Sequence, residues 1–266
     1  MKPFQTIGHY LTTWLALTRQ AFLVELTNRF SSLLFLVGKT VRFLMFLFIL
    51  DLVVKKTQVL AGYTWAQAVF FYLTFNLIDI TAQLFFRGIY HFRFKILSGE
   101  FDFFLLKPLN PLFLVLTSHT DLLDLITLIP LLFYTTFFAS RHFSPSPLQL
   151  VLFLLLFFNG LIIALAIHII VAAVGILTLE VDHTIWVYRD LSKMARFPVE
   201  IYPFLLRQLL TFVVPIAVMI NFPAKAFFGL LSPAGLLFAF LAAALLLFFS
   251  LRLWRFALTR YTSASS

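Results

Sequence analysis

Between two long apolar runs of the chain lies RGIYHFRFKILSGEFDFFLLKPLNP (Arg87–Pro111), a charged segment interrupted by glycine and proline. Its basic residues are Arg87, Arg93, Lys95 and Lys107. Basic residues gather in the cytoplasmic loops of membrane proteins, so we expect this segment in the cytosol. The pieces HFRFKIL and FDFFLL each predict a short amphipathic helix at the membrane surface, with a break at Ser98-Gly99. A structured loop of this kind suggests contact with a soluble partner.

The composition is that of a membrane protein. Hydrophobic residues make up 62% of the chain and charged residues 12%, whereas soluble domains average about 45–50% apolar and about 25% charged residues. A water-soluble fold of 266 residues could not bury 36 phenylalanines. We therefore predict an all-α polytopic membrane protein that forms one transmembrane domain over residues 1–266.

Charge and cysteine content exclude several classes of function. With no cysteine, the chain can form neither a disulfide nor a cysteine-based metal site. The net charge of +9 is distributed in short clusters beside apolar runs. This placement favours membrane topology and contact with lipid headgroups, and it does not favour a nucleic-acid partner.

Six segments are long and apolar enough to cross a bilayer as helices, which takes about 20 residues each. They are Leu33–Val54, Thr64–Phe86, Leu112–Phe138, Leu148–Leu179, Ile201–Asn221 and Ala234–Leu253. Lys39 and Arg42 fall in the inner half of the first segment, from which long side chains could extend to the cytosol. Residues 1–30 predict an amphipathic elbow helix that lies on the cytoplasmic surface.

Two connections depart from a plain six-helix pattern. Val181–Pro203 predicts a second cytoplasmic segment, with a helix ended at Pro198 because the residue before proline resists the helical conformation. Residues 221–233 are apolar but too short to span the membrane. We expect them to form a re-entrant or interfacial segment on the outer side, covered by protein.

The distribution of basic residues predicts the orientation in the cell membrane. Fourteen would face the cytosol: Lys2, Arg19, Arg29, Arg87, Arg93, Lys95, Lys107, Arg189, Lys193, Arg196, Arg207, Arg252, Arg255 and Arg260. Four would face the outside: Lys55, Lys56, Arg141 and Lys225. Both termini are therefore predicted to be cytoplasmic.

The sequence carries no motif for catalysis. Gly38-Lys39-Thr40 matches only the end of a phosphate-binding loop, because Leu33 stands where that motif requires glycine. Metalloprotease and serine-hydrolase motifs do not occur either. We therefore expect no enzymatic activity, metal site or cofactor on this chain alone.

Polar residues in two predicted spans are candidates for a functional site in the membrane. Asn76, Asp79 and Gln83 share a face of the second span, and Asp121 and Asp124 share a face of the third. Asp121 would lie about 14 Å along its helix at about 1.5 Å per residue. A carboxylate there costs at least about 2.5–3.5 kcal/mol and should face protein or water. These residues line a translocation path or form hydrogen bonds between helices.

Three stretches resemble the six-span permeases of the ATP-binding-cassette type-2 exporters, namely Ile96–Phe113, Arg196–Val218 and Leu251–Ser266. The string SGEFDFFLLKPLNP is the most specific part. The resemblance implies a permease subunit that moves a substrate out of the cytoplasm. It also implies a coupling helix between the second and third spans. A second permease, identical or homologous, and separate cytoplasmic ATPase subunits that carry ATP and magnesium would complete the transporter.

The same resemblance places seven residues in the coupling loop: Gly99, Glu100, Asp102, Lys107, Pro108, Asn110 and Pro111. Phe103, Phe104 and Leu105 add an apolar ridge between the charges, and we expect this ridge to dock in a groove of the ATPase. The glycine and the prolines would equally suit a turn that only re-enters the membrane. The low charge of the spans favours an amphipathic or lipid-like substrate.

Two other functions fit the sequence. One is an integral-membrane enzyme acting on a lipid, with Asp79, Asp121, Asp124 and His119 as acid–base groups. The other is a proton-coupled secondary transporter that uses the three aspartates. The missing metal and nucleophile motifs weigh against the enzyme. The missing second, inverted set of broken helices weighs against the secondary transporter.

Overall fold

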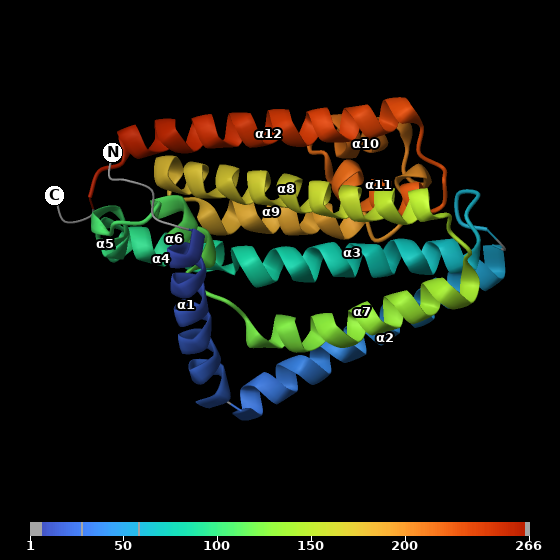
Figure 1. Ribbon diagram of the computed structural model, residues 1–266, viewed down its shortest axis with the longest axis horizontal. Helices are drawn as coiled ribbons and strands as arrows, with labels where there is room; N and C mark the ends of the chain where they lie inside the picture. The colour runs from blue at the N-terminus through green and yellow to red at the C-terminus, as the bar shows by residue number, and fades with distance from the viewer. Residues whose placement is uncertain (1–6, 28, 58, 264–266) are drawn as a thin grey trace.

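Long helices dominate the computed structural model, which describes residues 7–27, 29–57 and 59–263. Five helices form a bundle (Figure 1): α2 (Arg29–Thr57), α3 (Trp65–Phe86), α7 (Leu122–His142), α8 (Pro147–Thr178) and α12 (Pro233–Arg260). Each is long and apolar enough to cross a membrane, and a bent helix pair raises the number of candidate spans to six. No strand occurs in the described ranges. The predicted all-α polytopic membrane fold is confirmed.

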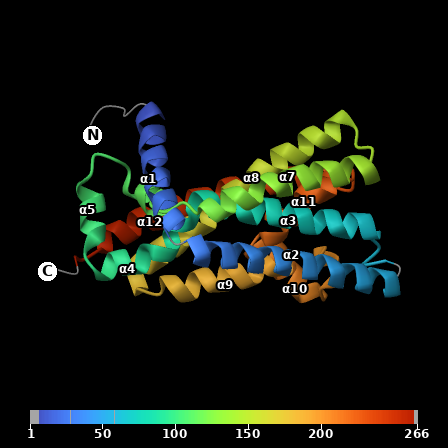
Figure 2. The same ribbon diagram turned by 90° about the horizontal axis from the view of Figure 1, so that it is seen from below.

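One end of the bundle collects the short helices. We call this end, on the left in Figure 1, the base; α12 finishes there, beside α4 (Phe92–Leu97) and α5 (Glu100–Leu106). Helix α1 (Ile7–Thr27) lies across the base, roughly perpendicular to the bundle in both Figure 1 and Figure 2. This is the arrangement expected of an elbow helix. Residues 1–6 and 28 of the predicted elbow lie outside the described residues.

The third predicted span is not one continuous helix. α6 (Pro111–Thr117) ends at Ser118, and α7 starts again at Leu122. Asp121 caps α7, because its carboxylate accepts a hydrogen bond from the backbone N–H of Leu123 at 2.7 Å. The expectation that Asp121 lies deep within a continuous helix was therefore wrong. It lies at the start of a helix, near the base.

The fifth predicted span, Ile201–Asn221, is bent. Phe204–Val213 and Ile216–Phe227 meet at 94°. Val214 and Pro215 form the break, because the residue before proline is pushed out of the helical conformation and proline lacks an N–H. The first part comprises α10 (Phe204–Gln208) and a π-helical turn, and the second is α11.

The bent segment is formed by other residues than the sequence predicted. Residues 221–227 belong to α11, so the bent segment covers residues 204–227 where the sequence suggested 221–233. α11 packs closely against α8. A Cβ added to Gly160 of α8 would lie 2.4 Å from the Met219 carbonyl oxygen, so only glycine fits there.

Helix α9 (Val181–Met194) corrects a second expectation, which had placed Val181–Pro203 in the cytosol. From the base, α9 runs back along α3, as successive contacts show: Asp182 with Arg93 at 3.5 Å, Arg189 with Asp79 at 2.9 Å, and Arg196 over the Phe75 ring at 5.1 Å. Beyond it, burial and then the charge of the nearby Glu200 raise the pKa of Tyr63 to about 12. Tyr63 precedes α3, so residues 181–203 follow α3 over its whole length.

The charged side chains of α9 led to the prediction of a cytoplasmic segment because such side chains usually contact water. In the structure a carboxylate or an aromatic ring faces them. With 204–227 bent at the far end, α9 and the residues after it connect the base to this bent segment.

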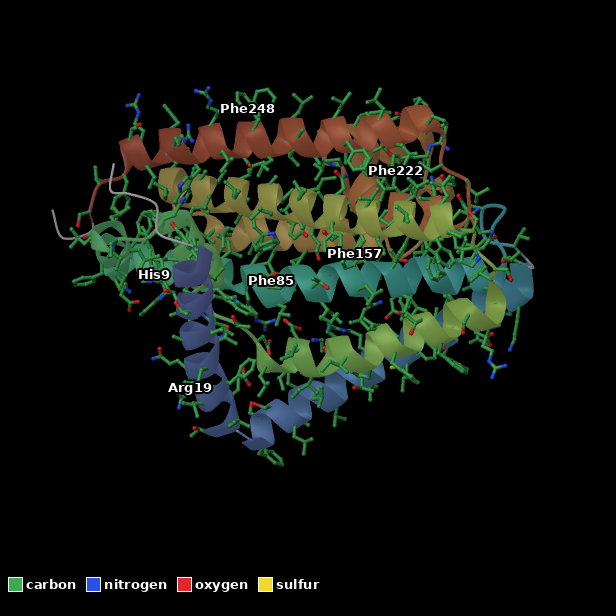
Figure 3. The ribbon with its side chains drawn as sticks, in the orientation of Figure 1. His9, Arg19, Phe85, Phe157, Phe222 and Phe248 are labelled. Atoms are coloured by element: carbon green, nitrogen blue, oxygen red, sulfur yellow. The ribbon has the colours of Figure 1, made fainter. Side chains whose placement is uncertain are left out.

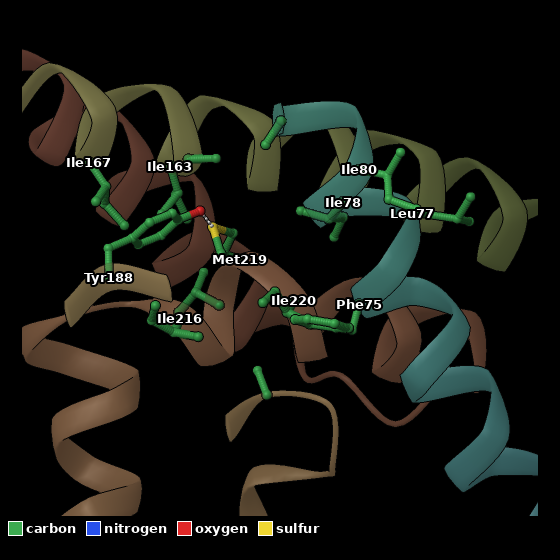
Figure 4. Packing of buried hydrophobic residues seen from close by; sticks show 14 of the residues in the cluster. Phe75, Leu77, Ile78, Ile80, Ile163, Ile167, Tyr188, Ile216, Met219 and Ile220 are labelled. Carbon is green, nitrogen blue, oxygen red and sulfur yellow. Dashed lines mark hydrogen bonds between the residues drawn. The ribbon is translucent and has the colours of Figure 1, made fainter. Parts of the chain in front are cut away.

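The interior is packed where α3, α8, α9 and α11 meet (Figure 4). The Tyr188 hydroxyl of α9 donates a hydrogen bond to the Met219 sulfur of α11 at 3.9 Å, amid Ile78 and Ile163. Apolar side chains also cover the outside of the bundle, and Phe248 extends from α12 in Figure 3. An apolar outer surface over a packed interior is what a lipid environment requires.

Candidate functional site

A cavity of about 300 Å³ lies between α2, α3, α7 and α9. Its charged lining is mostly basic: Lys39, Arg42, Arg189, Lys193 and Arg196. Asp79 is the acidic residue in that lining. Such a concentration of cations within helices of this apolarity marks a functional candidate, because buried charge at membrane depth is costly.

Aromatic rings form much of the remaining wall. Tyr72 of α3 stacks between two rings of α2, with centroid distances of 4.2 Å to Phe46 and 5.3 Å to Phe43. The Arg196 guanidinium lies 5.4 Å from the Phe46 ring centroid and 5.1 Å from that of Phe75. These faces stabilise the cation by cation–π attraction.

The cavity contains part of the polar stripe predicted on the second span. Asp79 pairs with Arg189 at 2.9 Å, and Asn76 donates to the Tyr72 carbonyl oxygen at 2.7 Å. Gln83 is buried away from the cavity, and its amide nitrogen has no hydrogen-bond partner among the described residues. Asn76 and Asp79 thus line the cavity, and Gln83 does not.

Asp121 and Asp124 form a separate ionic cluster near the base. Arg87 lies 2.9 Å from Asp121 and 3.0 Å from Asp124, and Lys39 pairs with Asp124. We call Lys39, Arg87, Asp121 and Asp124 the base cluster. Its two carboxylates are each 3% exposed and balance its two cations, which joins α2, the end of α3 and the start of α7.

Neither aspartate of the base cluster lines the cavity. Lys39 connects the two sites, because it lines the cavity and also donates to the Thr127 hydroxyl at 3.1 Å. The expectation that Lys39 extends to the cytosol was wrong, since its partner carboxylate lies inside the bundle. Sequence reasoning missed the base cluster and the pairing of Asp79 with Arg189. Basic residues within the first span were the available signal.

The predicted coupling loop consists of α4 and α5 joined at Gly99. Gly99 has φ +75°, a left-handed conformation that glycine adopts without strain. Across this turn Lys95 pairs with Glu100 at 3.2 Å. Asn110 then caps α6, accepting from the Leu112 N–H at 2.9 Å, with Pro111 in the first turn. Lys107 and Pro108 are exposed between the helices.

The apolar ridge differs from the prediction at one residue. Phe104 is 8% exposed, and the ammonium groups of Lys95 and Lys107 each lie 5.2 Å from its ring centroid. It therefore stabilises the loop from within and is not available to a partner. Phe103 is 64% exposed, Leu105 39% and Leu106 80%, so Phe103 and Leu106 present most of the apolar surface and Leu105 adds to it.

The end of the chain holds the loop in place. Asp102 accepts hydrogen bonds from the Tyr261 hydroxyl at 2.9 Å and from Ser263. Burial, together with the hydrogen bond and charge of Asp102, raises the pKa of Tyr261 to about 12. The buried Phe101 ring packs against Tyr261 and Trp254, with centroid distances of 5.0 and 6.3 Å. The loop is thus bound to the last turns of α12.

His119 lies outside the cavity. Its ring centroid is 4.5 Å from that of His91, and burial, followed by the charge of Arg87, lowers its pKa. In the described part of the chain, no three His, Asp or Glu side chains are grouped as a metal site would require.

A family model described as ABC-2 family transporter protein matches residues 40–265. The match includes the coupling loop and most of the cavity lining. No curated protein and no solved structure matches the chain.

Proposed function

This chain belongs to the ABC-2 family of transporter proteins, and we propose that it is the membrane-spanning subunit of an exporter whose ATP is hydrolysed by a separate cytoplasmic subunit. Membership of this family makes the chain a membrane permease of an ABC transporter. Export, the ATPase and a second permease, identical or homologous, are the further parts of this proposal. Magnesium and ATP would bind the ATPase subunit.

The observation that carries the proposal is the exposed pair Phe103 and Leu106 on α5. Internal contacts of Asp102, Phe101 and Phe104 fix the helix, yet these two large apolar side chains remain uncovered at the base. An apolar pair on a short, fixed helix suits a groove of a partner protein. Glu100 and Lys107 flank the pair and would set its register.

The base cluster offers a route from this loop to the bundle. The loop leaves α3 at Arg87, and Arg87 binds both Asp121 and Asp124 at the start of α7. Lys39 extends the same network to α2 and the cavity. ATP binding to the partner would move α4 and α5 and shift the population between inward- and outward-facing packings of the permease.

The base would face the cytosol, with both termini on that side of the cell membrane. The elements at the base in Figure 1 are α1, the end of α3, α4, α5 and the end of α12, and they contain or adjoin Arg19, Arg87, Arg93, Lys95, Lys107, Arg252, Arg255 and Arg260. The elements at the far end are the end of α2, the end of α7, α10 and α11, and they contain Lys55, Lys56, Arg141, Arg207 and Lys225. This excess supports the orientation even though Arg189, Lys193 and Arg196 lie along the bundle.

Pairing of the carboxylates disfavours the two alternative functions. Asp79, Asp121 and Asp124 each have a cationic partner within 3.0 Å. A carboxylate bound in such an ion pair would have to break the pair before it could carry a proton or act as a general acid. Only Asp79 of the three borders the cavity in which a substrate could react.

Reconstitution tests the proposal. The purified chain should not hydrolyse ATP, whereas its complex with the ABC ATPase encoded by a neighbouring gene should do so, faster in proteoliposomes than the ATPase alone. Hydrolysis by the isolated chain, or a neighbouring ATPase that neither binds the chain nor responds to it, would contradict the proposal.

A further inference from the structure

The cavity between α2, α3, α7 and α9 carries more positive charge than its neighbouring carboxylates compensate. Three of its five basic residues are paired: Lys39 with Asp124, Arg189 with Asp79 and Lys193 with Asp190. The other two, Arg42 and Arg196, form neither an ion pair nor a side-chain hydrogen bond with any described residue. The site therefore has two cations available for a ligand.

Arg42 is placed where an unpaired charge is costly. It is the fourteenth residue of the 29-residue helix α2, and therefore lies about 20 Å from either end at about 1.5 Å per residue. That distance exceeds the length of an arginine side chain, so the Arg42 guanidinium cannot reach either end of α2. An ionisable residue at such a depth indicates a functional site.

Arg196 is held in position but incompletely satisfied. The rings of Phe46 and Phe75 face its guanidinium, and its Nε is buried without a hydrogen-bond partner among the described residues. Arg42 and Arg196 also repel each other electrostatically across the cavity. An anion placed between them would relieve this repulsion and accept hydrogen bonds from both guanidinium groups.

An apolar groove adjoins the charged cavity on the surface of α2. It is lined by Gly38, Val41, Arg42, Met45, Phe46 and Ile49. Arg42 and Phe46 belong to the linings of both the groove and the cavity. A charged site that continues into an apolar groove matches a molecule with an anionic head and a hydrocarbon tail.

We propose that this site binds an amphiphile with an anionic headgroup, a phosphate or a carboxylate, with its head between Arg42 and Arg196 and its tail along the α2 groove. The inference rests on the proposed function in one respect, namely that the bound amphiphile is the transported substrate. Binding itself needs no ATPase. A failure of binding would therefore leave ATP coupling untouched, and a failure of coupling would leave the binding site untouched.

Native mass spectrometry of the purified full chain tests the site. The probes are dioctanoyl phosphatidate and dioctanoyl phosphatidylcholine, which share their tails and differ in headgroup charge. The wild-type chain should bind the phosphatidate at least about tenfold more tightly, as charge-assisted hydrogen bonds would give. Equal Kd values for the two lipids would overturn the proposal without any variant.

Variants locate the binding. Arg42→Gln with Arg196→Gln should raise the Kd for phosphatidate about tenfold and leave that for phosphatidylcholine unchanged. Arg42→Lys keeps the charge and should retain most of the affinity. Arg252→Gln is the matched control, because the Arg252 guanidinium also lies over a phenylalanine ring, 5.1 Å from Phe248, on α12. An unchanged phosphatidate Kd in the double variant would refute the assigned residues.

Competition distinguishes a lipid headgroup from free phosphate. Millimolar inorganic phosphate should not displace the bound phosphatidate, because the tail contributes to binding through the groove. Displacement by inorganic phosphate would show a site for the free ion and overturn the amphiphile assignment. Met45→Ser should weaken phosphatidate binding through the tail alone, with no change in headgroup preference.

Discussion

The guanidinium of Arg87 lies 2.9 Å from the carboxylate of Asp121. This ion pair joins the residue that caps the end of α3 to the residue that caps the start of α7. The ion pair therefore holds together the two ends of the segment that contains α4, α5 and α6. Movement of the loop must displace this pair or carry both helices with it. The base cluster thus joins the start of the loop to α2 and α7.

Removing Arg87 should destabilise the chain. Arg87→Gln leaves Asp121 and Asp124, each 3% exposed, with Lys39 as their one cation. Breaking a buried ionic network by removing one partner costs about 3–5 kcal/mol, reduced here because Arg87 is partly exposed. Thermal unfolding in detergent should show a lowered Tm. Lys55→Gln is the control, because its pair with Asp51 on α2 is exposed and worth about 0–1 kcal/mol. Equal Tm values for the two variants would count against the cluster.

Asp79 and Arg189 should be energetically coupled. A double-mutant cycle with Asp79→Asn and Arg189→Gln should give a coupling energy of about 1–3 kcal/mol, because the 2.9 Å pair is mostly buried. If the pair serves packing, transport per assembled complex should remain near the wild-type level in the double variant. Independent, additive effects of the two substitutions would show that the pair does not form.

Acid should weaken the structure around His119. Its pKa is lowered below the unfolded value of about 6.5 by burial, by Arg87 and by Lys95, although Asp121 acts in the opposite direction. The folded chain therefore favours neutral His119. The contribution of this preference to the free energy of unfolding is complete above pH 6.5. That contribution is lost as pH falls below 6.5 through the lowered pKa.

The measurement is Tm between pH 7.5 and pH 5. His119→Gln should flatten the loss of Tm on acidification, whereas His183→Gln, at an exposed histidine on α9, should leave it unchanged. His91 lies beside His119 and burial also lowers its pKa, so part of the loss of Tm will persist in His119→Gln. An identical pH profile for His119→Gln and wild type would contradict the assignment.

Cysteine labelling distinguishes the path of α9 from the sequence prediction. Single cysteines at His183 and Leu205, both exposed in a chain without native cysteine, lie in the first turn of α9 and just after the residues that follow α3. We expect His183→Cys to react from the cytosol and Leu205→Cys from the outside, with Ser98→Cys and Ser146→Cys as references for the two sides. Labelling of both test positions from the cytosol would restore the cytoplasmic assignment of Val181–Pro203.

Hydrophobicity predicted most of the fold because the bilayer imposes length and polarity on each helix. The loop helices on either side of Gly99 were also predictable, since charge, glycine and proline mark their ends locally. Helix α9 was not, because Arg189 and Arg196 suggest water unless their partners on α3 are known. The break before Asp121 escaped prediction because Thr117 and Asp121 were interpreted as one face of a continuous helix. In the structure α6 ends at Thr117 and Asp121 caps the start of α7.

The candidate site divides in the same way. Single polar residues such as Asp79 could be located on a helix face from spacing alone. Their partners come from positions more than 100 residues away, as with Arg189, and no local pattern reveals such pairings. The buried ring of Phe104 likewise has the ammonium groups of Lys95 and Lys107 beside it, which sequence spacing alone did not predict.

Substitution of the exposed residues Phe103 and Leu106 tests whether α5 contacts the ATPase. Phe103→Ala with Leu106→Ala should weaken binding of the ATPase at least about thirtyfold, since truncating an interface anchor costs about 2 kcal/mol or more. The control pair is Ile129→Ala with Phe133→Ala, equally exposed residues one turn apart on α7. The account predicts lost co-purification or uncoupled ATP hydrolysis for the α5 pair and intact binding for the α7 pair. Full ATPase binding and full coupled transport in the α5 variant, at wild-type Tm, would contradict it.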